Sequence, residues 1–236
     1  MLFRSVEIKH LAKRSNISVK ETLSRLQTAG LDSIPGGGAE ILVDRIRDRI
    51  CRGKETSKEY LDIHREAHKL GIPTNCTMLF GTIESIEDRI THLELLRELQ
   101  DETNGFQCFV PYPFLPDFTR LPEAQLATSN EILRTIAISR LMLDNIPHIK
   151  AYRMNIGDSV AQMALVSGAD DIDGTVGHEE IMHAAGSTTP LDSQVNDLVQ
   201  LIEDTNQLSV RRNSIYSKFE VIYPNIDDNN VLPVLN

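Results

Sequence analysis

The sequence predicts an α/β protein in which short parallel strands are covered by helices. Two observations carry this prediction. Short apolar runs rich in β-branched residues alternate with longer segments in which apolar residues recur at helical spacing. Capping residues and glycines separate these segments from one another. Such alternation is typical of parallel sheets, because their crossover connections are helices.

The expected helices each begin at a polar cap. Ser18 and Glu21 form a capping box for the first, which stops at Gly30. Ser85, with Asp88 three residues later, opens another helix. The segment "NEILRTIAISRLML" is apolar nearly all round, so we expect its helix to be buried. Further helices are expected over residues 39–50, residues 57–70 with Ser57 as cap, and residues 159–166.

The expected strands are short, apolar and spread along the chain. The second strand contains three β-branched residues, and each strand is followed by a helical pattern. We expect "GADDIDGT" to be a loop, and two polar helices and a plain tail to complete the chain. The expected strands are "LDSIP", "IPTNCTMLF", "GFQCFV" and "HIKAYR".

Composition excludes several classes of function. The 236-residue chain has a formal net charge of -10, which argues against a nucleic-acid partner because phosphate binding needs a basic face. No apolar run is long enough for a membrane span, and the start lacks a signal-peptide core. The three cysteines, Cys51, Cys76 and Cys108, are far apart in sequence and suggest no disulfide framework. We therefore expect a cytoplasmic protein.

The stretch "LDSIPGGGAEIL" places three glycines between an expected strand and an expected helix. Ligands of parallel α/β folds bind at the carboxyl ends of strands, where a helix N-terminus favours an anion or polar ligand. Three glycines exceed what a tight turn needs, so close approach of a ligand is our preferred interpretation. A turn without a ligand is the alternative, because a Gly-rich turn is a weak motif.

Five stretches in this order carry a resemblance to a known family: "LDSIPGGGAEIL", "AHKLGIPTNCTMLFGTIES", "HLELLRELQDETNGFQCFVPYPF", "RLMLDNIPHIKAY" and "GADDIDGTV". Together they resemble the menaquinone and deazaflavin branch of the radical S-adenosylmethionine (SAM) enzymes. Within this branch, "PHIKAY" with "DIDGT" resembles the aminofutalosine synthases. The cyclic dehypoxanthine futalosine synthases and the deazaflavin (FO) synthases are the alternatives.

The resemblance implies a TIM-type (β/α) barrel, a 4Fe–4S cluster and S-adenosylmethionine. It also implies a small-molecule substrate. In aminofutalosine synthases a 5′-deoxyadenosyl radical adds to 3-[(1-carboxyvinyl)oxy]benzoate, and loss of the carboxylate gives aminofutalosine. Menaquinone biosynthesis is the implied pathway.

The resemblance also implies site residues, although it identifies no catalytic residue. The glycines and Glu40 would contact S-adenosylmethionine, and "MLFGTIES" would contact its adenine. For Glu84 the alternative interpretation is a charge that stabilises a helix N-terminus. For Lys150 the alternative interpretation is a cation whose ammonium group reaches solvent. The implied cofactor-binding residues are Gly36, Gly37, Gly38, Glu40, Gly81, Ile83 and Glu84. The implied substrate-binding residues are Arg47, His148, Lys150, Tyr152, Asp171 and Asp173.

Two positions depart from the implied pattern or compete with it. Arg153 stands where the family usually has Trp, which puts one wall of the implied pocket in question. Asp170 is interpreted as part of an acidic turn. His64 and His68 are one helical turn apart and could chelate a metal, but helix packing is the favoured role because Glu66 fits no zinc motif.

The chief departure concerns the cluster. Radical SAM enzymes hold it with three cysteines spaced C-x3-C-x2-C, and this chain has no such triplet. "FRSVEI" resembles the fourth-strand region of the family. We therefore expect the C-terminal half of a barrel at residues 1–176, a helical extension and tail at residues 177–236, and a partner fragment that carries the cluster. A non-catalytic remnant is the alternative.

Overall fold

A computed structural model describes residues 3–117 and 119–222 of the chain. Its main sheet has four parallel strands in the order β1-β2-β3-β4, so the expected α/β class is confirmed. A separate antiparallel hairpin is formed by β5 and β6. The strands are β1 (Thr74–Phe80), β2 (Phe106–Pro113), β3 (His148–Ala151), β4 (Asp171–Ile172), β5 (Val210–Arg212) and β6 (Phe219–Val221).

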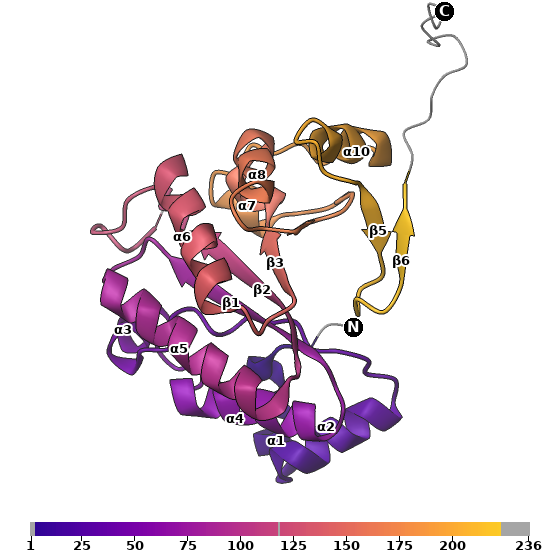
Figure 1. The fold of residues 1–236 in the computed structure, drawn as a ribbon. Helices are drawn as coiled ribbons and strands as arrows, with labels where there is room; N and C mark the ends of the chain where they lie inside the picture. Colours follow the sequence, from indigo (N-terminus) through magenta and orange to yellow (C-terminus); the bar gives the residue numbers. More distant parts are fainter. Residues whose placement is uncertain (1–2, 118, 223–236) are drawn as a thin grey trace, which may run out of the picture.

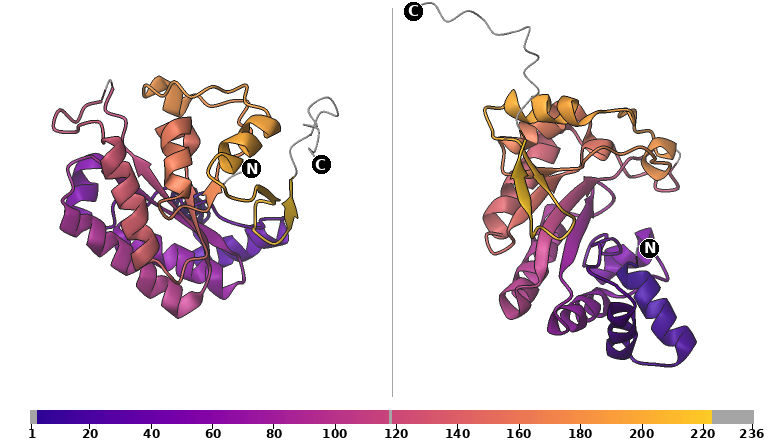
Figure 2. Two further views of the ribbon diagram at one scale, coloured as in Figure 1. Left: turned by 45° about the horizontal axis from the view of Figure 1, so that its top comes forward. Right: turned by 90° about the vertical axis from the view of Figure 1, so that its right-hand side faces the viewer.

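Helices connect the strands and cover one side of the sheet (Figures 1 and 2). The first two helices, α1 and α2, pack on each other and on α4. The helices are α1 (Ser5–Ser15), α2 (Val19–Thr28), α3 (Asp44–Ile50), α4 (Ser57–Lys69), α5 (Ile86–Thr103), α6 (Ser129–Met142), α7 (Arg153–Ile156), α8 (Asp158–Leu165), α9 (Ile181–Ala184) and α10 (Val195–Glu203).

The main core lies between the sheet and α5, α6 and α8. Met78 and Phe80 of β1 and Phe109 of β2 are fully buried there against Leu96 of α5. A second, smaller core joins α1, α2 and α4 around Ile8 and further aliphatic residues. We call the helix-covered side of the sheet its outer face, and the opposite side its inner face.

Several expected elements differ in the structure. "FRSVEI" belongs to helix α1 instead of a strand, and "LDSIP" contributes only one bridge, from Ile34 to Thr74. Helix α3 begins at Asp44 instead of residue 39, because Glu40 adopts a left-handed conformation (φ 46°) that interrupts a helix. Thr56, instead of Ser57, caps α4. Leu141 of α6 is 79% exposed, so the expectation that this helix is buried is wrong on one face.

The C-terminal part differs most from expectation. "GADDIDGT" contains strand β4 instead of being only a loop. The helical extension expected at residues 177–236 contains α9 and α10, but residues 210–221 form the β5–β6 hairpin where a plain tail was expected. Residues 223–236 lie outside the described residues. Within the described residues, no helix has the length and apolar character needed to cross a membrane.

Candidate functional site

The inner face of the sheet collects polar side chains from all four strands. Cys76 of β1 pairs with Phe109 of β2, and both side chains lie in the main core on the outer face of the sheet. Because side chains alternate along a strand, the residues next to them lie on the inner face. The same alternation and register continue through β3 and β4. The inner-face residues of the strands are Asn75, Thr77, Leu79, Cys108, Val110, Tyr112, His148, Lys150 and Asp171. Tyr152 and Asp173 continue the same alternation directly after β3 and β4, and the Tyr152 ring contacts Tyr112. The sequence therefore predicted five residues that do share one face.

Near the amino ends of β3 and β4, Asp171 is the centre of an ion cluster. It accepts hydrogen bonds from Arg212 (2.7 and 3.0 Å) and from the Tyr216 hydroxyl (2.6 Å). The Lys150 ammonium lies 3.2 Å away. Burial favours a higher pKa for Asp171, but the Arg212 hydrogen bond and the Lys150 charge outweigh it, so the pKa is lowered. The carboxylate is thus ionised and neutralised within the chain.

The β5–β6 hairpin covers this ion cluster. The Tyr216 ring stacks on His148 with 4.5 Å between ring centroids, and the Arg212 guanidinium lies 4.0 Å from the Tyr216 centroid. His148 also contacts Asp170 at 2.7 Å, and Asp170 accepts a hydrogen bond from the Ile149 N–H. We call His148, Lys150, Asp171, Arg212 and Tyr216 the amino-end cluster.

At the carboxyl ends of the strands, fewer of the polar side-chain atoms on the inner face have hydrogen-bond partners within the described residues. The Tyr112 and Tyr152 rings meet edge to face at 5.1 Å, and burial raises the pKa of Tyr152 to about 12. Asp173 is 6% exposed; one of its oxygens accepts the Arg153 N–H, while the other has no hydrogen-bond partner in the part of the chain that the structure describes. Burial raises the pKa of Asp173 although the Arg153 charge opposes this. Asp173 can therefore accept a ligand hydroxyl or hold a proton.

Arg153 is fully buried beside Asp173. Its guanidinium donates to Asp158 (2.9 Å) and to the Ser193 hydroxyl (3.3 Å), whereas its Nε has no hydrogen-bond partner among the described residues. Arg153 Nε and the unpaired Asp173 oxygen are 3.8 Å apart. Arg153 is therefore a buried cation at the position where the resemblance usually has Trp. We call Tyr112, Tyr152, Arg153 and Asp173 the carboxyl-end group.

A segment after α9 crosses next to this group and encloses a pocket. The Ser187 hydroxyl donates to the Met154 carbonyl (2.6 Å), and the Thr189 hydroxyl donates to the Arg153 carbonyl (3.2 Å). The pocket, of about 290 Å³, lies between residues 185–189 and the end of β2. Asn155 lines it, and its buried side-chain oxygen accepts no hydrogen bond from the residues that the structure describes. Unsatisfied polar atoms therefore gather at the carboxyl ends of the strands.

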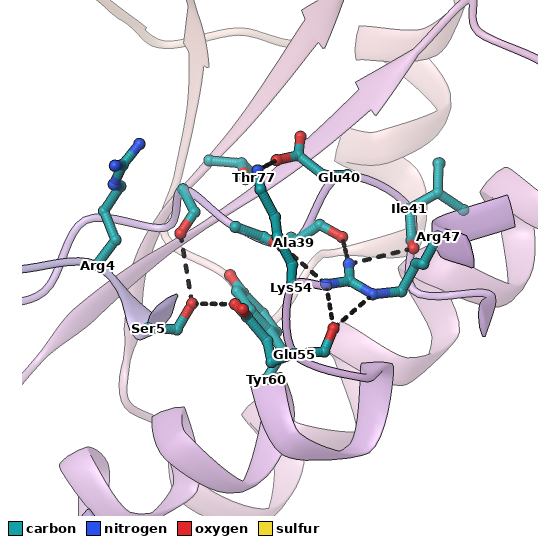
Figure 3. Close-up of polar contacts among 12 residues, drawn as sticks. Arg4, Ser5, Ala39, Glu40, Ile41, Arg47, Lys54, Glu55, Tyr60 and Thr77 are labelled. Carbon is teal, nitrogen blue, oxygen red and sulfur yellow. Dashed lines mark hydrogen bonds and ion pairs between the residues drawn. The ribbon is translucent and has the colours of Figure 1, made fainter. Parts of the chain in front are cut away.

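The glycine stretch, residues 34–40, runs alongside β1 instead of turning at a strand end (Figure 3). A Cβ atom on Gly36 would lie 2.6 Å from the Cα atom of Cys76, so a side chain there would collide with β1 itself. The Gly36 carbonyl accepts hydrogen bonds from the Tyr60 and Thr77 hydroxyls, each at 2.8 Å. Packing of the chain accounts for this glycine without a ligand.

The neighbouring positions have similar explanations. Gly37 faces the flexible Arg4 side chain, 3.0 Å from an added Cβ. Gly38 has φ +116° and would contact Ser5 and Glu55 at 2.7 Å, so only glycine fits well. Glu40 pairs with Lys54 at 2.5 Å. That these residues contact S-adenosylmethionine stays a prediction, but the glycines do not require it.

Arg47 and Glu84 are occupied by their own loops. The buried Arg47 guanidinium donates to the carbonyls of Ala39, Gly38 (3.1 Å) and Glu55 (2.6 Å) and so holds the glycine stretch in place (Figure 3). Within residues 3–117 and 119–222, the polar atoms of both side chains are bonded to their own chain, so the geometry lends no support to their predicted ligand roles. The Glu84 side chain is fully buried and accepts the N–H groups of Gly81 (2.6 Å) and Thr82 (2.8 Å).

The residues present do not fit a 4Fe–4S cluster. Cys76 is on β1 and Cys108 on β2, whereas Cys51 follows α3. Burial raises the pKa of the Cys108 thiol to about 12 and that of Cys76 well above its ordinary value, whereas cluster ligands must be thiolates. Among residues 3–117 and 119–222, no three His, Cys, Asp or Glu side chains converge on a metal site.

The two spaced histidines serve packing, as the favoured interpretation predicted. His64 and His68 both hydrogen-bond the Thr74 hydroxyl at 2.8 Å, and His68 also bonds Thr103 at 2.6 Å. Burial lowers the pKa of His64 to about 3 and that of His68 to about 4, so both rings are neutral at pH 7. They join α4 to the start of β1.

Three inner-face partners escaped the sequence analysis: Tyr112, Arg212 and Tyr216. Tyr112 could have been found by extending the strand "GFQCFV" through "PYP", because it keeps the alternation of Cys108 and Val110. Arg212 and Tyr216 belong to the hairpin, which carries no motif that the sequence analysis could use.

Comparison with family models gives two matches along the chain. Residues 4–96 match the "Radical SAM superfamily" and residues 103–223 match the "CofH/MqnC C-terminal region". Together the two matches include the glycine stretch and all four strands of the parallel sheet.

Curated relatives match over most of the chain. The aminodeoxyfutalosine synthase of Thermus thermophilus is 43% identical over 92% of this chain and 59% of its own length. The cyclic dehypoxanthine futalosine synthase of Streptomyces coelicolor is 38% identical over 91% of this chain and 53% of its own length. A 5-amino-6-(D-ribitylamino)uracil–L-tyrosine 4-hydroxyphenyl transferase of Methanothermobacter thermautotrophicus is 37% identical over 92% of this chain and 61% of its own length. The chain thus spans about three fifths or less of these relatives.

A solved structure has a similar fold. Methylornithine synthase (PylB) matches with a TM-score of 0.64 and 18% identity, over 83% of this chain and 57% of that protein. At this identity the match concerns the arrangement of strands and helices only.

Proposed function

Because the chain belongs to the CofH/MqnC family within the radical SAM superfamily, we propose that it forms the substrate-binding part of an aminodeoxyfutalosine synthase. The proposed ligands are S-adenosylmethionine and 3-[(1-carboxyvinyl)oxy]benzoate, and the proposed product is aminofutalosine. The 43% identity to the Thermus thermophilus aminodeoxyfutalosine synthase supports this choice of reaction within the family.

The observation that carries the proposal is the uneven pairing of the inner face. The amino-end cluster neutralises its own charges through close hydrogen bonds, whereas at the carboxyl ends one Asp173 oxygen accepts no hydrogen bond from the described residues and has only the Arg153 guanidinium 3.8 Å away. Parallel α/β folds bind their ligands at these ends. We therefore assign ligand contact to Tyr152 and Asp173 first.

The other predicted ligand residues have supporting roles in this proposal. The amino ends of the inner face are held by His148, Lys150 and Asp171, and Lys150 supplies a cation there that is paired with Asp171 at 3.2 Å. The edge of the sheet beside β1 is stabilised by residues 36–38, Glu40 and Arg47. Gly81, Ile83 and Glu84 shape the turn after β1.

Because the three cysteines do not fit a 4Fe–4S cluster, we propose that a separate polypeptide supplies its ligands. Such a partner would correspond to the part of the Thermus thermophilus relative that this chain does not match. The cluster would supply the electron that cleaves S-adenosylmethionine. A reducing cytoplasm is the proposed compartment, in keeping with three free thiols.

The test combines this chain with the unmatched portion of the Thermus thermophilus protein. The two polypeptides are co-produced, reconstituted anaerobically with iron and sulfide, and given reductant, S-adenosylmethionine and the enol-ether substrate. We expect 5′-deoxyadenosine and aminofutalosine to be absent with this chain alone and aminofutalosine to form with the pair. Stoichiometric cluster iron on this chain alone, or no product from a folded pair, contradicts the proposal.

A matched pair of variants locates the site. Asp173→Asn keeps an acceptor for the Arg153 N–H but removes the charge, so product formation should fall at least tenfold with little change in melting temperature. Asp144→Asn alters an acid that is 67% exposed and should leave product formation unchanged. Equal rates for Asp173→Asn and the unaltered pair would remove Asp173 from the site.

A further inference from the structure

The β5–β6 hairpin, drawn in yellow in Figure 1, lies over the amino-end cluster without sharing a hydrophobic core with the sheet. In the part of the chain that the structure describes, neither core includes a residue of the hairpin. Its apolar side chains are largely exposed: Phe219 is 56% exposed, and Val210 and Val221 are each 38% exposed. Burial of apolar surface therefore contributes little to holding the hairpin against the sheet.

Bonds within the hairpin make it a unit. Its two strands pair with each other, Val210 opposite Val221, and with no other strand of residues 3–117 and 119–222. At the turn, the Asn213 side-chain oxygen accepts the N–H groups of Ser217 (2.9 Å) and Lys218 (3.1 Å), and the Asn213 N–H donates to the Lys218 carbonyl (3.2 Å). Because none of these bonds involves the sheet, the hairpin keeps them when it moves.

The segment between α10 and β5 has the properties of a hinge. Residues 204 and 206–208 are exposed, and Asn206 has a left-handed backbone conformation (φ 60°). The Ser209 hydroxyl donates to the Glu203 carboxylate (2.9 Å), which ties the base of the hairpin to the end of α10. A hinge needs only a few positions at the end of an element that absorb a change in φ and ψ. Residues 204–208 supply such positions beside a fixed base.

The contacts that hold the hairpin against the sheet centre on Asp171. This carboxylate accepts hydrogen bonds from the Arg212 guanidinium and the Tyr216 hydroxyl, and the Tyr216 ring stacks on His148. The Asp171 side chain is 11% exposed and the Arg212 side chain 20% exposed, so solvent reaches the edge of the contact. A small set of polar contacts at the edge of solvent opens at a lower free energy than a packed core does.

We propose that the hairpin is a strap that opens and closes over the amino ends of the sheet as one unit, with Asp171 as its latch. When the strap is shut, it covers Lys150 and Cys108; the Cys108 side chain is fully buried close to the Tyr216 hydroxyl. When the strap is open, solvent reaches these side chains from the amino ends. The inference does not depend on the proposed function. The strap decides whether water enters the inner face from this side.

The three thiols of the chain report on the strap in one experiment. The full chain is treated with N-ethylmaleimide, and modification of each cysteine is followed by mass spectrometry of its peptide. Cys51 is partly exposed and gives the rate of an accessible thiol. Cys76 is fully buried in the main core, so its modification reports global unfolding. Cys108 becomes accessible in global unfolding and also when the strap opens, so we expect it to react at least tenfold faster than Cys76.

A variant at the latch tests whether Asp171 holds the strap shut. Arg212→Gln removes the guanidinium from the hairpin and leaves Asp171 beside Lys150, so the sheet keeps its own ion pair. We expect Cys108 to react at least tenfold faster in this variant than in the unaltered chain, whereas Cys76 keeps its rate.

Two further variants complete the comparison. Arg211→Gln is the matched control, because Arg211 is exposed and its side chain points to the opposite side of β5 from Arg212. It should leave the rates of all three thiols unchanged. Tyr216→Phe loses only the hydroxyl bond to Asp171 and keeps the ring, so it should speed Cys108 by a smaller factor than Arg212→Gln. This milder variant keeps the test informative if Arg212→Gln does not fold.

Each outcome decides the question. Equal rates for Cys76 and Cys108 in the unaltered chain would show that the hairpin leaves the sheet only in global unfolding, and would overturn the inference. Latch variants that speed both thiols alike, or that do not speed Cys108, would also overturn it. Faster modification of Cys108 alone in Arg212→Gln or Tyr216→Phe, with Arg211→Gln unchanged, supports the strap whether or not the chain takes part in the proposed reaction.

Discussion

The two edges of the parallel sheet differ in how completely they are paired. At one edge, residues 34–40 lie against β1, and the carbonyls of this stretch are bonded by Tyr60, Thr77 and Arg47. At the other edge, β4 pairs only with β3 among residues 3–117 and 119–222, and one Asp173 oxygen accepts no hydrogen bond from these residues. The glycine-rich edge is closed, whereas the acidic edge is open.

This difference shows that a motif's composition does not indicate whether its groups are free. Three consecutive glycines suggested space for a ligand, yet the space beside Gly36 is filled by the backbone of β1. An acidic segment that resembled an ordinary loop contains the open strand edge and the unpaired carboxylate oxygen. The proposed ligand binding should therefore depend on the acidic edge, and stability on both edges.

The largest expected effect comes from removing the acid that holds the acidic edge to the hairpin. Asp171→Ala leaves Lys150 and Arg212 without their shared counter-charge in a largely buried place, so we expect a loss of about 3–5 kcal/mol in the free energy of unfolding. The melting temperature should fall by roughly 10 °C. Lys54→Ala, at the glycine-rich edge, breaks a partly exposed pair and should cost at most about 1 kcal/mol. Similar losses for the two variants would contradict the comparison.

How far the sequence could predict the molecule depends on the range of the interactions involved. The strands β1, β2 and β3 and the caps at Ser18 and Ser85 follow from local pattern, and the family expected from the motifs is confirmed. Alternation along β3 and β4 also brought Lys150 and Asp171 to one face. These features need only neighbouring residues or a strand period.

Features that depend on distant contacts could not be predicted in this way. Gly36 is explained by Cys76, which is forty residues later in the chain. The β5–β6 hairpin is short, and its Tyr216 and Arg212 are placed by their contacts with His148 and Asp171 instead of by a local pattern. From the sequence alone, the expectation at these positions was therefore a plain tail.

As the pH falls, the interactions at the glycine-rich edge should lose stability before those at the acidic edge. His92 accepts the Leu42 N–H just after the glycine stretch, and His64 bonds Thr74 beside Ile34. Burial lowers the pKa of each to about 3, below the value of about 6.5 in an unfolded chain. The unfolded chain therefore binds more protons between these pH values, and stability falls as the pH falls below 6.5.

Between pH 7 and 5.5 this linkage amounts to about 1.2 kcal/mol for each of these two histidines, or about 2.5 kcal/mol together. Asp171 stays ionised over this range because its pKa is lowered. The measurement is the urea midpoint at the two pH values, with His92→Gln as the variant that should reduce the difference. Equal midpoints at pH 7 and 5.5 would show that these histidines are not buried in neutral form.

The smallest expected effect separates two adjacent glycines at the closed edge. Gly36→Ala places a Cβ 2.6 Å from the Cys76 backbone, which cannot move without shifting β1, so we expect a loss of about 1–3 kcal/mol in the free energy of unfolding. Gly37→Ala meets only the Arg4 side chain at 3.0 Å, and Gly37 does not have a positive φ. Because a flexible side chain can move aside, Gly37→Ala should change stability by less than about 0.5 kcal/mol. Urea unfolding of both variants gives the comparison. If a ligand required the glycines, both variants would keep full stability and would lose S-adenosylmethionine binding equally. If the packing against β1 requires a glycine, the loss of stability would be confined to Gly36→Ala.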